Sequence, residues 1–174
     1  FSALSGAERL LGAMLEGDTP RGVRPNLITF NALIHATATG GGHSSFDKAY
    51  SVYDSMVDRG LRPSVVTYTA LISAAALQGT ADAVDKAMAI FQSLPPCMLN
   101  QRTYVAMMRA LSTVGRDQAA LGLLADARRR GVRPNVYMYS AALSAARQDD
   151  EAVRLLVRAM ERDGVDYRRN KVIA

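Results

Sequence analysis

The side chains best suited to chemistry in this sequence are arginines, which bind phosphate groups. Lys and Arg number 21 against 16 Asp and Glu, a formal net charge of +5, which favours a polyanionic partner but also serves solubility. One set recurs in Gly-aliphatic-Arg-Pro loops and another forms a consecutive run: Arg24, Arg62 and Arg133, then Arg128, Arg129 and Arg130. Two interpretations fit the recurring set: a phosphate-binding track, or a solvated rim that offsets the negative ends of helices.

Catalytic and metal-binding residues are sparse. Cys97 is the only cysteine, so neither an intrachain disulfide nor a thiolate zinc site can form. His35 and His43 are isolated, and the glycines at 40–42 indicate a turn, because no lysine follows them as in a phosphate-binding loop. No apolar run approaches the roughly 20 residues of a membrane-spanning helix. We expect no catalysis, cofactor, metal ion, membrane or small-molecule substrate here; any catalytic domain would lie elsewhere in a longer protein.

Four similar segments of the sequence define the elements that carry these residues. Their aromatic anchors are separated by 38, 36 and 35 residues: Phe30, Tyr68, Tyr104 and Tyr139. Each anchor follows a loop, and three of these loops share the form Gly-aliphatic-Arg-Pro. A fixed period of this length is typical of helical repeat proteins.

Each repeat is predicted to contain two helices. The first begins just past the loop proline, which fits ahead of a helix but not inside one. Apolar residues then recur at helical spacing, as in Phe30, Leu33 and Ile34. A helix pair of this size cannot bury its apolar stripe alone, so the pairs must stack. The sequence therefore predicts an all-α fold, a right-handed α-solenoid (superhelix) of stacked helix-turn-helix repeats.

The repeat pattern also predicts the boundaries of the units. The fourth unit is about two residues short, which we assign to its inter-helix turn near Gln148, and its closing loop lacks the proline. Terminal repeats are often irregular in this way. The predicted units are a remnant of a preceding repeat (second helix and loop) at 1–26, repeat 1 at 27–64, repeat 2 at 65–100, repeat 3 at 101–135, a degenerate repeat 4 at 136–168, and the start of a further helix or a tail at 169–174.

These features resemble the pentatricopeptide repeat (PPR) family, specifically its plain 35-residue type. Residues 65–72 show the family pattern of a hydrophobic pair, threonine, an aromatic residue, a variable polar residue, a small residue and two aliphatics. Residues 60–64 show its closing pattern of glycine, an aliphatic, a basic residue, proline and a small polar residue. The resemblance covers residues 27 to about 168. It implies selective binding of single-stranded RNA, one base per repeat, along the face lined by the first helices.

The resemblance assigns roles to individual residues. The residue after each anchor and the last residue of the repeat would read one base: Asn31 with Ser64, Thr69 with Asn100, Val105 with Asn135, and Ser140 with Arg168. The second residue of each repeat would flank the base: Ile28, Val66, Arg102 and Tyr137. The first pair is expected to read cytosine and the second adenine. The alternatives are ordinary exposed polar positions for Asn31, Thr69 and Ser140, and helix-start packing for Ile28 and Val66.

Two features depart from the family pattern. Val105 has no hydrogen-bonding group, so repeat 3 can discriminate only through Asn135 or by shape. Many family members carry a phosphate-binding lysine near the end of the first helix, where this sequence has Thr39, Leu77 and Thr113. Because phosphate contacts supply much of nucleic-acid affinity, we expect a weaker grip on the RNA backbone.

Four functions remain open at this stage. The first is an RNA-binding protein of organellar RNA metabolism or translation, acting in transcript processing, stabilisation or translation. The second is a structural component of a large ribonucleoprotein such as an organellar ribosome, which would contact rRNA and ribosomal or other proteins by shape. The third is a protein–protein scaffold without RNA, and the fourth is the substrate-binding arm of an RNA-cleaving enzyme. The family resemblance alone implies a mitochondrion or chloroplast.

Overall fold

The computed structural model describes residues 9, 12, 25–40 and 42–165 of the 174-residue chain. These residues form α-helices and short 3-10 turns, with no strand among them. The elements are α2 Leu27–Gly40, η1 Gly42–Ser44, α3 Ser45–Asp58, α4 Val65–Gln78, α5 Ala81–Ser93, η2 Pro96–Met98, α6 Gln101–Thr113, α7 Asp117–Arg129, α8 Val136–Ala145 and α9 Asp150–Arg162. The predicted tail at 169–174 and nearly all of the predicted remnant at 1–26 lie outside the described residues.

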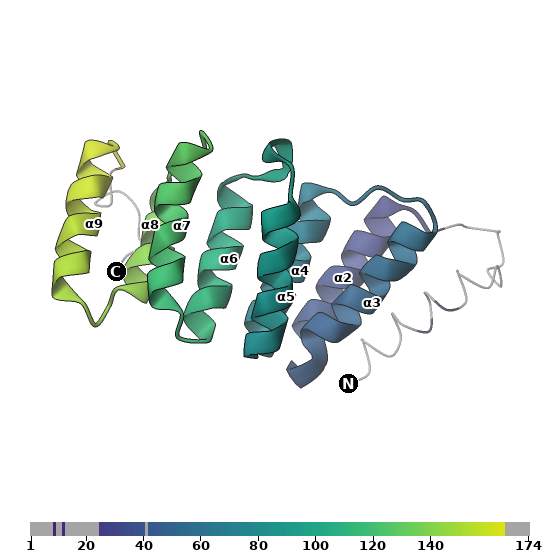
Figure 1. Cartoon of the computed structure of the whole chain (residues 1–174). Coiled ribbons are helices and arrows are strands. Elements are labelled where there is room, and N and C mark those ends of the chain that lie inside the picture. Colours follow the sequence, from purple (N-terminus) through teal and green to yellow (C-terminus); the bar gives the residue numbers. More distant parts are fainter. Residues whose placement is uncertain (1–8, 10–11, 13–24, 41, 166–174) are drawn as a thin grey trace.

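The helices are arranged in two layers (Figure 1). The first helices of successive repeats, α2, α4, α6 and α8, contact one another in chain order and form one layer. The second helices, α3, α5, α7 and α9, form the other layer. Each of the four predicted repeats contains one helix from each layer. The predicted all-α solenoid of stacked helix pairs is confirmed.

Polar residues at the ends of the closing loops cap the first helices. Ser64 and Asn100 have extended backbones and accept hydrogen bonds from the backbone N–H groups of Thr67 and Thr103, whose side chains in turn accept from the cap residues' own N–H groups. Asn135 caps α8 by accepting from Met138 N at 3.0 Å. Such caps satisfy N–H groups that have no partner inside the helix.

Glycine in the left-handed region follows three of the four second helices, α3, α7 and α9, whereas α5 ends without one. Gly60, Gly131 and Gly164 have φ of 72°, 77° and 70°. The residue after each glycine donates its N–H back into the last helical turn, as Val132 does to the Ala127 carbonyl at 2.9 Å. This pattern satisfies carbonyls at the helix end and favours a residue without a Cβ. The repeated glycines therefore fix where the chain turns back towards the next repeat.

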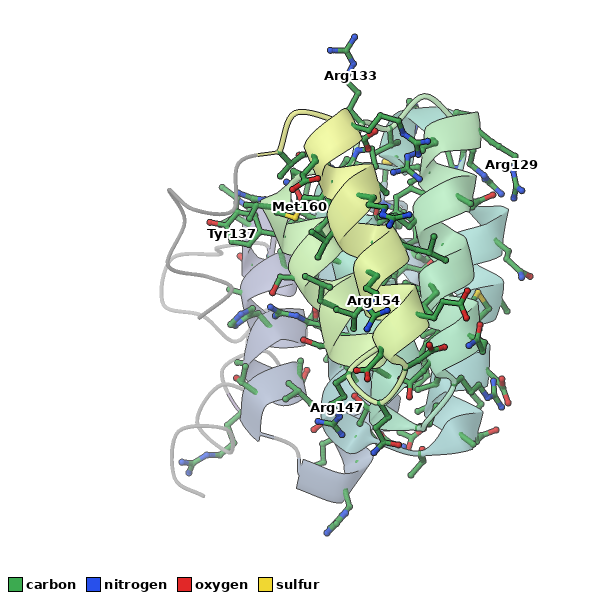
Figure 2. All side chains as sticks on the ribbon, turned by 90° about the vertical axis from the view of Figure 1, so that its left-hand side faces the viewer. Arg129, Arg133, Tyr137, Arg147, Arg154 and Met160 are labelled. Carbon is green, nitrogen blue, oxygen red and sulfur yellow. The ribbon has the colours of Figure 1, made fainter. Side chains whose placement is uncertain are left out.

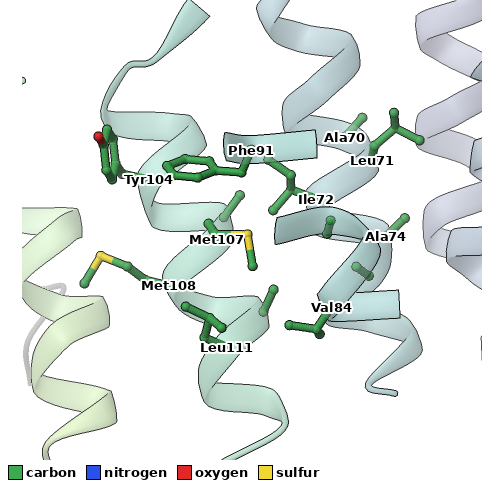
Figure 3. Close-up of a cluster of buried hydrophobic side chains, with 14 of the residues drawn as sticks. Ala70, Leu71, Ile72, Ala74, Val84, Phe91, Tyr104, Met107, Met108 and Leu111 are labelled. Atoms are coloured by element: carbon green, nitrogen blue, oxygen red, sulfur yellow. The ribbon is translucent and has the colours of Figure 1, made fainter. Parts of the chain in front are cut away.

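The core runs continuously through the repeats and is built from anchors and small residues. Figure 3 shows the part between α4, α5 and α6, where Phe91 of one repeat meets Tyr104 of the next. Their ring centroids are 5.1 Å apart and their planes are nearly perpendicular, a favourable aromatic geometry. Buried alanines such as Ala74 and Ala87 let neighbouring helices approach closely. Each repeat thus buries its apolar face against the next.

The fourth repeat is shortened in a different place from the one predicted. We expected the missing residues in the turn near Gln148, but the helix itself is shorter: α8 has 10 residues, whereas α2 and α4 have 14 each. The turn that follows, residues 146–149, is longer than the connection at 79–80 in the second repeat. The early end of α8 therefore moves Arg147 from a helical position into a turn.

A partly buried polar network ties the fourth repeat to the third. The hydroxyl of Tyr139 donates to Asp163 at 2.8 Å, and Arg128 of α7 donates to Asp163 at 2.9 Å and to the Tyr139 hydroxyl at 2.6 Å. Burial, followed by the hydrogen bond to Asp163, raises the pKa of Tyr139 to about 12. Burial alone would raise the pKa of Asp163, but hydrogen bonds from Arg128 and Tyr139 outweigh it and hold that pKa below its usual value.

Replacing Gly131 with alanine is expected to lower the free energy of unfolding by about 1 kcal/mol, because a Cβ disfavours positive φ. Gly122 is the matched control: it lies inside α7, where an added Cβ meets nothing within 4 Å. Gly122→Ala is expected to leave the stability unchanged or to raise it, since alanine favours helices. Urea unfolding of both variants checks this, and an equal loss in the two would contradict the assigned role of Gly131.

Asp163→Asn is expected to lower the free energy of unfolding at neutral pH by about 1–3 kcal/mol, because it removes a charged hydrogen-bond acceptor. The depressed pKa gives the sign of the pH dependence: the contribution is complete above the unfolded-state value of about 4 and is lost as the pH falls through the folded-state value. Urea unfolding from pH 7 towards pH 3 should therefore show wild type and variant converging. Asp82→Asn, at an exposed pair with Lys86, is the control and should change little.

Candidate functional site

The first-helix layer carries a groove that collects several of the predicted site residues. The groove has a volume of about 530 Å³ and lies between α2, α4 and the start of α6. Its lining includes Asn31, Thr69 and Asn100 from the predicted base-reading pairs, and Val66 and Arg102 from the predicted flanking positions. These residues come from three successive repeats and include both predicted base-reading and predicted base-flanking positions. Stacking thus brings positions that are distant in sequence to one surface.

The first predicted pair, Asn31 with Ser64, is in contact and is oriented by a third residue. Thr67 Oγ1 donates to Asn31 Oδ1 at 2.6 Å, and Asn31 Nδ2 lies 3.5 Å from Ser64 Oγ. The Thr67 oxygen already accepts from the Ser64 N–H, so its own proton is free for Asn31. The Asn31 amide therefore keeps its oxygen towards Thr67 and its NH2 group towards Ser64, which leaves N–H donor capacity for a ligand.

The second predicted pair, Thr69 with Asn100, presents one acceptor and one donor. The Thr69 hydroxyl donates to the Val65 carbonyl at 2.7 Å, so its oxygen can only accept from a ligand. Asn100 Oδ1 accepts from the backbone N–H groups of Arg102 and Thr103, which leaves its NH2 group as a donor. Both side chains are half-buried and line the groove. The capping bonds thus fix the polarity of this pair.

The third predicted pair, Val105 with Asn135, lies outside this groove. Val105 is half-buried and packs against the core. Asn135 Nδ2 donates to Gln101 Oε1 at 2.9 Å, and Gln101 Nε2 donates to the Arg133 carbonyl at 2.8 Å. The Asn135 amide is therefore engaged on both its oxygen and its nitrogen, and this pair has less capacity for a ligand than the first two.

The predicted flanking residues are exposed. The accessible fractions are 77% for Ile28, 58% for Val66 and 52% for Tyr137, and Arg102 is also exposed. Large apolar side chains at this level of exposure are available to a ligand. Within the described part of the chain, this exposure argues against the alternative that Ile28 and Val66 serve helix-start packing. Ser140 of the fourth pair lines a second groove, and Arg168 lies outside the described residues.

The predicted phosphate-binding arginines do not gather at the groove. Figure 2 shows Arg129 and Tyr137 on opposite sides of the molecule, and Arg133 at one end of it. Arg128 is bound to Asp163, while Arg129 and Arg130 reach Asp126 at 3.0 and 3.1 Å. Arg62 and Arg133 are exposed in loops, and Arg24 lies outside the described residues. The consecutive arginines at the end of α7, in the second-helix layer, therefore pair with carboxylates of the protein itself.

Sequence reasoning missed several residues of this surface. Thr67 and Gln101 orient Asn31 and Asn135, and only the interlocking of repeats reveals these contacts. Arg109 and Arg147 line the second groove together with Ser140. Helical spacing from the base-reading positions was an available signal, because Arg109 follows Val105 by one turn.

Other classes of site find no support in the described residues. Their His, Cys, Asp and Glu side chains form no group of three or more that could hold a metal ion. None of their helices combines the length and the apolar character that a bilayer crossing requires. Cys97 is exposed.

Solved structures of other proteins share this architecture, and three of them are compared below. PPR10 in complex with an 18-nt psaJ RNA element is 21% identical, with a TM-score of 0.71, over 96% of this chain and 24% of PPR10. The PPR domain of Arabidopsis thaliana protein-only RNase P 1 with tRNA is 16% identical, with a TM-score of 0.66, over 98% of this chain and 86% of that one. Nuclear proteinaceous RNase P 2 from A. thaliana is 19% identical, with a TM-score of 0.66, over 91% and 34%. These similarities establish the fold, and the chain spans about a quarter of the length of PPR10.

Sequence comparison assigns the family. A comparison with curated proteins gives no match. The sequence pattern of the PPR repeat family matches residues 40–76, and that of the pentatricopeptide repeat domain matches residues 98–148 and 122–169. The matched residues together make up more than half of the chain and include anchors of the second to fourth repeats. With the stacked helix pairs and the capped first helices, they show that this chain belongs to the pentatricopeptide repeat family.

Proposed function

We propose that this chain binds single-stranded RNA along the first-helix layer, with successive bases at successive repeats. The observation that carries the proposal is the groove in which Asn31, Thr69 and Asn100 lie beside exposed Val66 and Arg102. Polar groups there can meet base edges, and the apolar and planar side chains can hold base faces, which contribute roughly 1–3 kcal/mol per stacked base. The RNA-bound PPR10 and the tRNA-bound RNase P domain are of the same fold and support this choice of partner.

The second repeat has the polarity needed for adenine. The base-pairing edge of adenine presents an amino donor beside a ring-nitrogen acceptor. Thr69 can only accept and Asn100 has an NH2 group to donate, because their remaining capacity is used within the protein. This acceptor and donor complement the adenine edge, in agreement with the base that the family pattern implies. The first repeat, through the Asn31 NH2 group and the Ser64 hydroxyl, suits the ring-nitrogen acceptor of cytosine.

The third repeat is expected to tolerate different bases. Val105 offers no hydrogen bond, and the Asn135 amide is held by Gln101 and by its capping bond. With two repeats reading bases well, at about 1–3 kcal/mol each, the chain alone would be a weak and permissive binder. Selective binding to a long transcript would need further repeats or a partner. The proposed role is transcript processing, stabilisation or translation in a mitochondrion or chloroplast, and the organelle rests on family membership alone.

A second candidate function is a structural component of a large ribonucleoprotein that contacts RNA by shape. The engaged Asn135 and the absence of lysine at Thr39, Leu77 and Thr113 favour it. Selection from randomised single-stranded RNA over a salt series separates the two candidates. Base reading predicts enriched sites with C followed by A. Steeply salt-dependent binding without enrichment would favour the structural role, and no binding would favour a protein scaffold.

Asn100→Asp is expected to change the preferred base at the second repeat from adenine to guanine. Aspartate caps helices as well as asparagine does, so the fold is retained, but the ligand-facing donor becomes an acceptor. Guanine presents its ring N–H and its amino group side by side, two donors that the acceptors of Thr69 and the new aspartate can meet, whereas the ring nitrogen of adenine presents a lone pair. We expect a change in relative affinity of about tenfold or more, on the scale of one base contact, measured by fluorescence anisotropy with RNAs that differ at one position.

The matched control for this variant is Gln92→Glu, the same amide-to-carboxylate change at an exposed position of α5 in the other layer. It should weaken binding to all RNAs slightly and leave the base preference intact. An unchanged preference in Asn100→Asp, or an equal change in the control, would contradict base reading by Asn100.

A further inference from the structure

A second groove follows the first along the first-helix layer. It has a volume of about 650 Å³ and lies between the ends of α4 and α6 and the turn after α8. Leu77 lines both grooves, so the two are adjoining parts of one surface. The second groove is lined by two arginines, Arg109 and Arg147, whereas the first is lined by one, Arg102.

The position of Arg109 follows from the repeat. The residue five places after each anchor lines a groove in every repeat: His35 and Ser73 the first, and Arg109 and Ser144 the second. Arg147 lies eight places after its anchor, and the equivalent residues of the other repeats also line the grooves, but its backbone setting differs. Its counterparts Ala38 and Ala76 lie inside longer first helices, whereas α8 ends at Ala145 and leaves Arg147 exposed in the turn.

Both guanidinium groups are available to a ligand. The ion pairs in the described part of the chain engage Arg116, Arg128, Arg129 and Arg130, but neither Arg109 nor Arg147. Asp117, at the first turn of α7, is the acidic residue of the lining, and it forms no ion pair with either arginine. The groove therefore has two unpaired cations and one carboxylate, a net positive charge.

A buried hydroxyl in the same groove also lacks a partner. Ser112 Oγ is the one buried side-chain oxygen or nitrogen of the described residues with no hydrogen-bond partner. Ser112 lines the groove one turn after Arg109. An unsatisfied buried hydroxyl is destabilising, so this end of α6 is a place in the groove where a polar partner is missing.

We propose that Arg109 and Arg147 bind a backbone phosphate of the RNA at the junction of the third and fourth repeats. This inference rests on the proposed RNA-binding function. It assigns a contact to the RNA backbone in a chain that lacks the phosphate-binding lysines of many family members. Arginine suits this role because its planar guanidinium forms paired hydrogen bonds to phosphate oxygens. The sites at Thr39, Leu77 and Thr113 are uncharged, so the grip is concentrated at the third and fourth repeats.

The test is the salt dependence of RNA binding by the full chain. The probe is a fluorescently labelled oligouridine with one CA step, measured by anisotropy from roughly 50 to 200 mM salt. Removing one arginine that binds phosphate should lower the slope of log affinity against log salt by about 0.7 for single-stranded RNA. The double variant Arg109→Gln/Arg147→Gln should thus reduce the slope by about 1.4. The factor by which affinity falls between the lowest and the highest salt concentration should then be about sevenfold smaller for this variant than for the wild type.

The control is Arg154→Gln/Arg158→Gln, which removes the same charge from exposed positions of α9 in the other layer. Its slope should stay close to the wild-type value. Asp117→Asn should act in the opposite direction and tighten binding by about two- to threefold at low salt, because it removes the carboxylate of the groove.

The outcomes separate this site from the proposed function. If the wild type binds the CA probe but the two double variants have equal slopes, the phosphate site is wrong and RNA binding stands. If the wild type binds no RNA at any salt concentration, both are wrong. Circular dichroism of each variant should match the wild type, and the opposite response of Asp117→Asn keeps the test decisive if one arginine variant fails to fold.

Discussion

The structure depends on one packing constraint: no helix pair in this chain can bury its apolar face without the next pair. Phe91 of the second repeat is completed by Tyr104 of the third, and the core continues in this way through the described repeats. Because the repeats are nearly equal in length, stacking places equivalent residues in a row along the first-helix layer. The positions of Asn31, Thr69 and Asn100 in one groove are a direct consequence of core packing.

The residues that cap the first helices also prepare the surface for a ligand. A capping side chain uses its oxygen on backbone N–H groups, so an asparagine at this place keeps its NH2 group for the groove. Asn100 follows this rule, while Asn135 follows it only in part, because Gln101 accepts one of the two N–H donors of its NH2 group. Helix capping therefore sets the chemistry of each repeat before any RNA is present, and one neighbouring residue is enough to change it.

The sequence predicted the fold well because the repeat signals are local. The anchors, the loop prolines and the closing glycines each act within a few residues, and the helices begin and end where these signals predict. The prediction placed the shortening of the fourth repeat in the turn after α8 instead of in the helix itself, since sequence spacing alone cannot distinguish a shorter helix from a shorter turn. The pairs of Arg129 and Arg130 with Asp126 lie within about one helical turn, so helical spacing could have predicted them. The pairing of Arg128 with Asp163, and the meeting of Arg109 and Arg147 in one groove, could not be predicted because they join residues of different helices and repeats.

The central claim is that RNA lies on the first-helix layer, and exposed aliphatic side chains on the two layers provide a direct measurement. Ile28 and Val66 lie on first helices, whereas Val57 and Leu155 lie on second helices and are also exposed. Methyl NMR of the full chain, titrated with single-stranded RNA that carries a CA step, reports on both layers at once. The proposed interface predicts shifts for Ile28 and Val66 and none for Val57 and Leu155. Shifts confined to Val57 and Leu155 would contradict it.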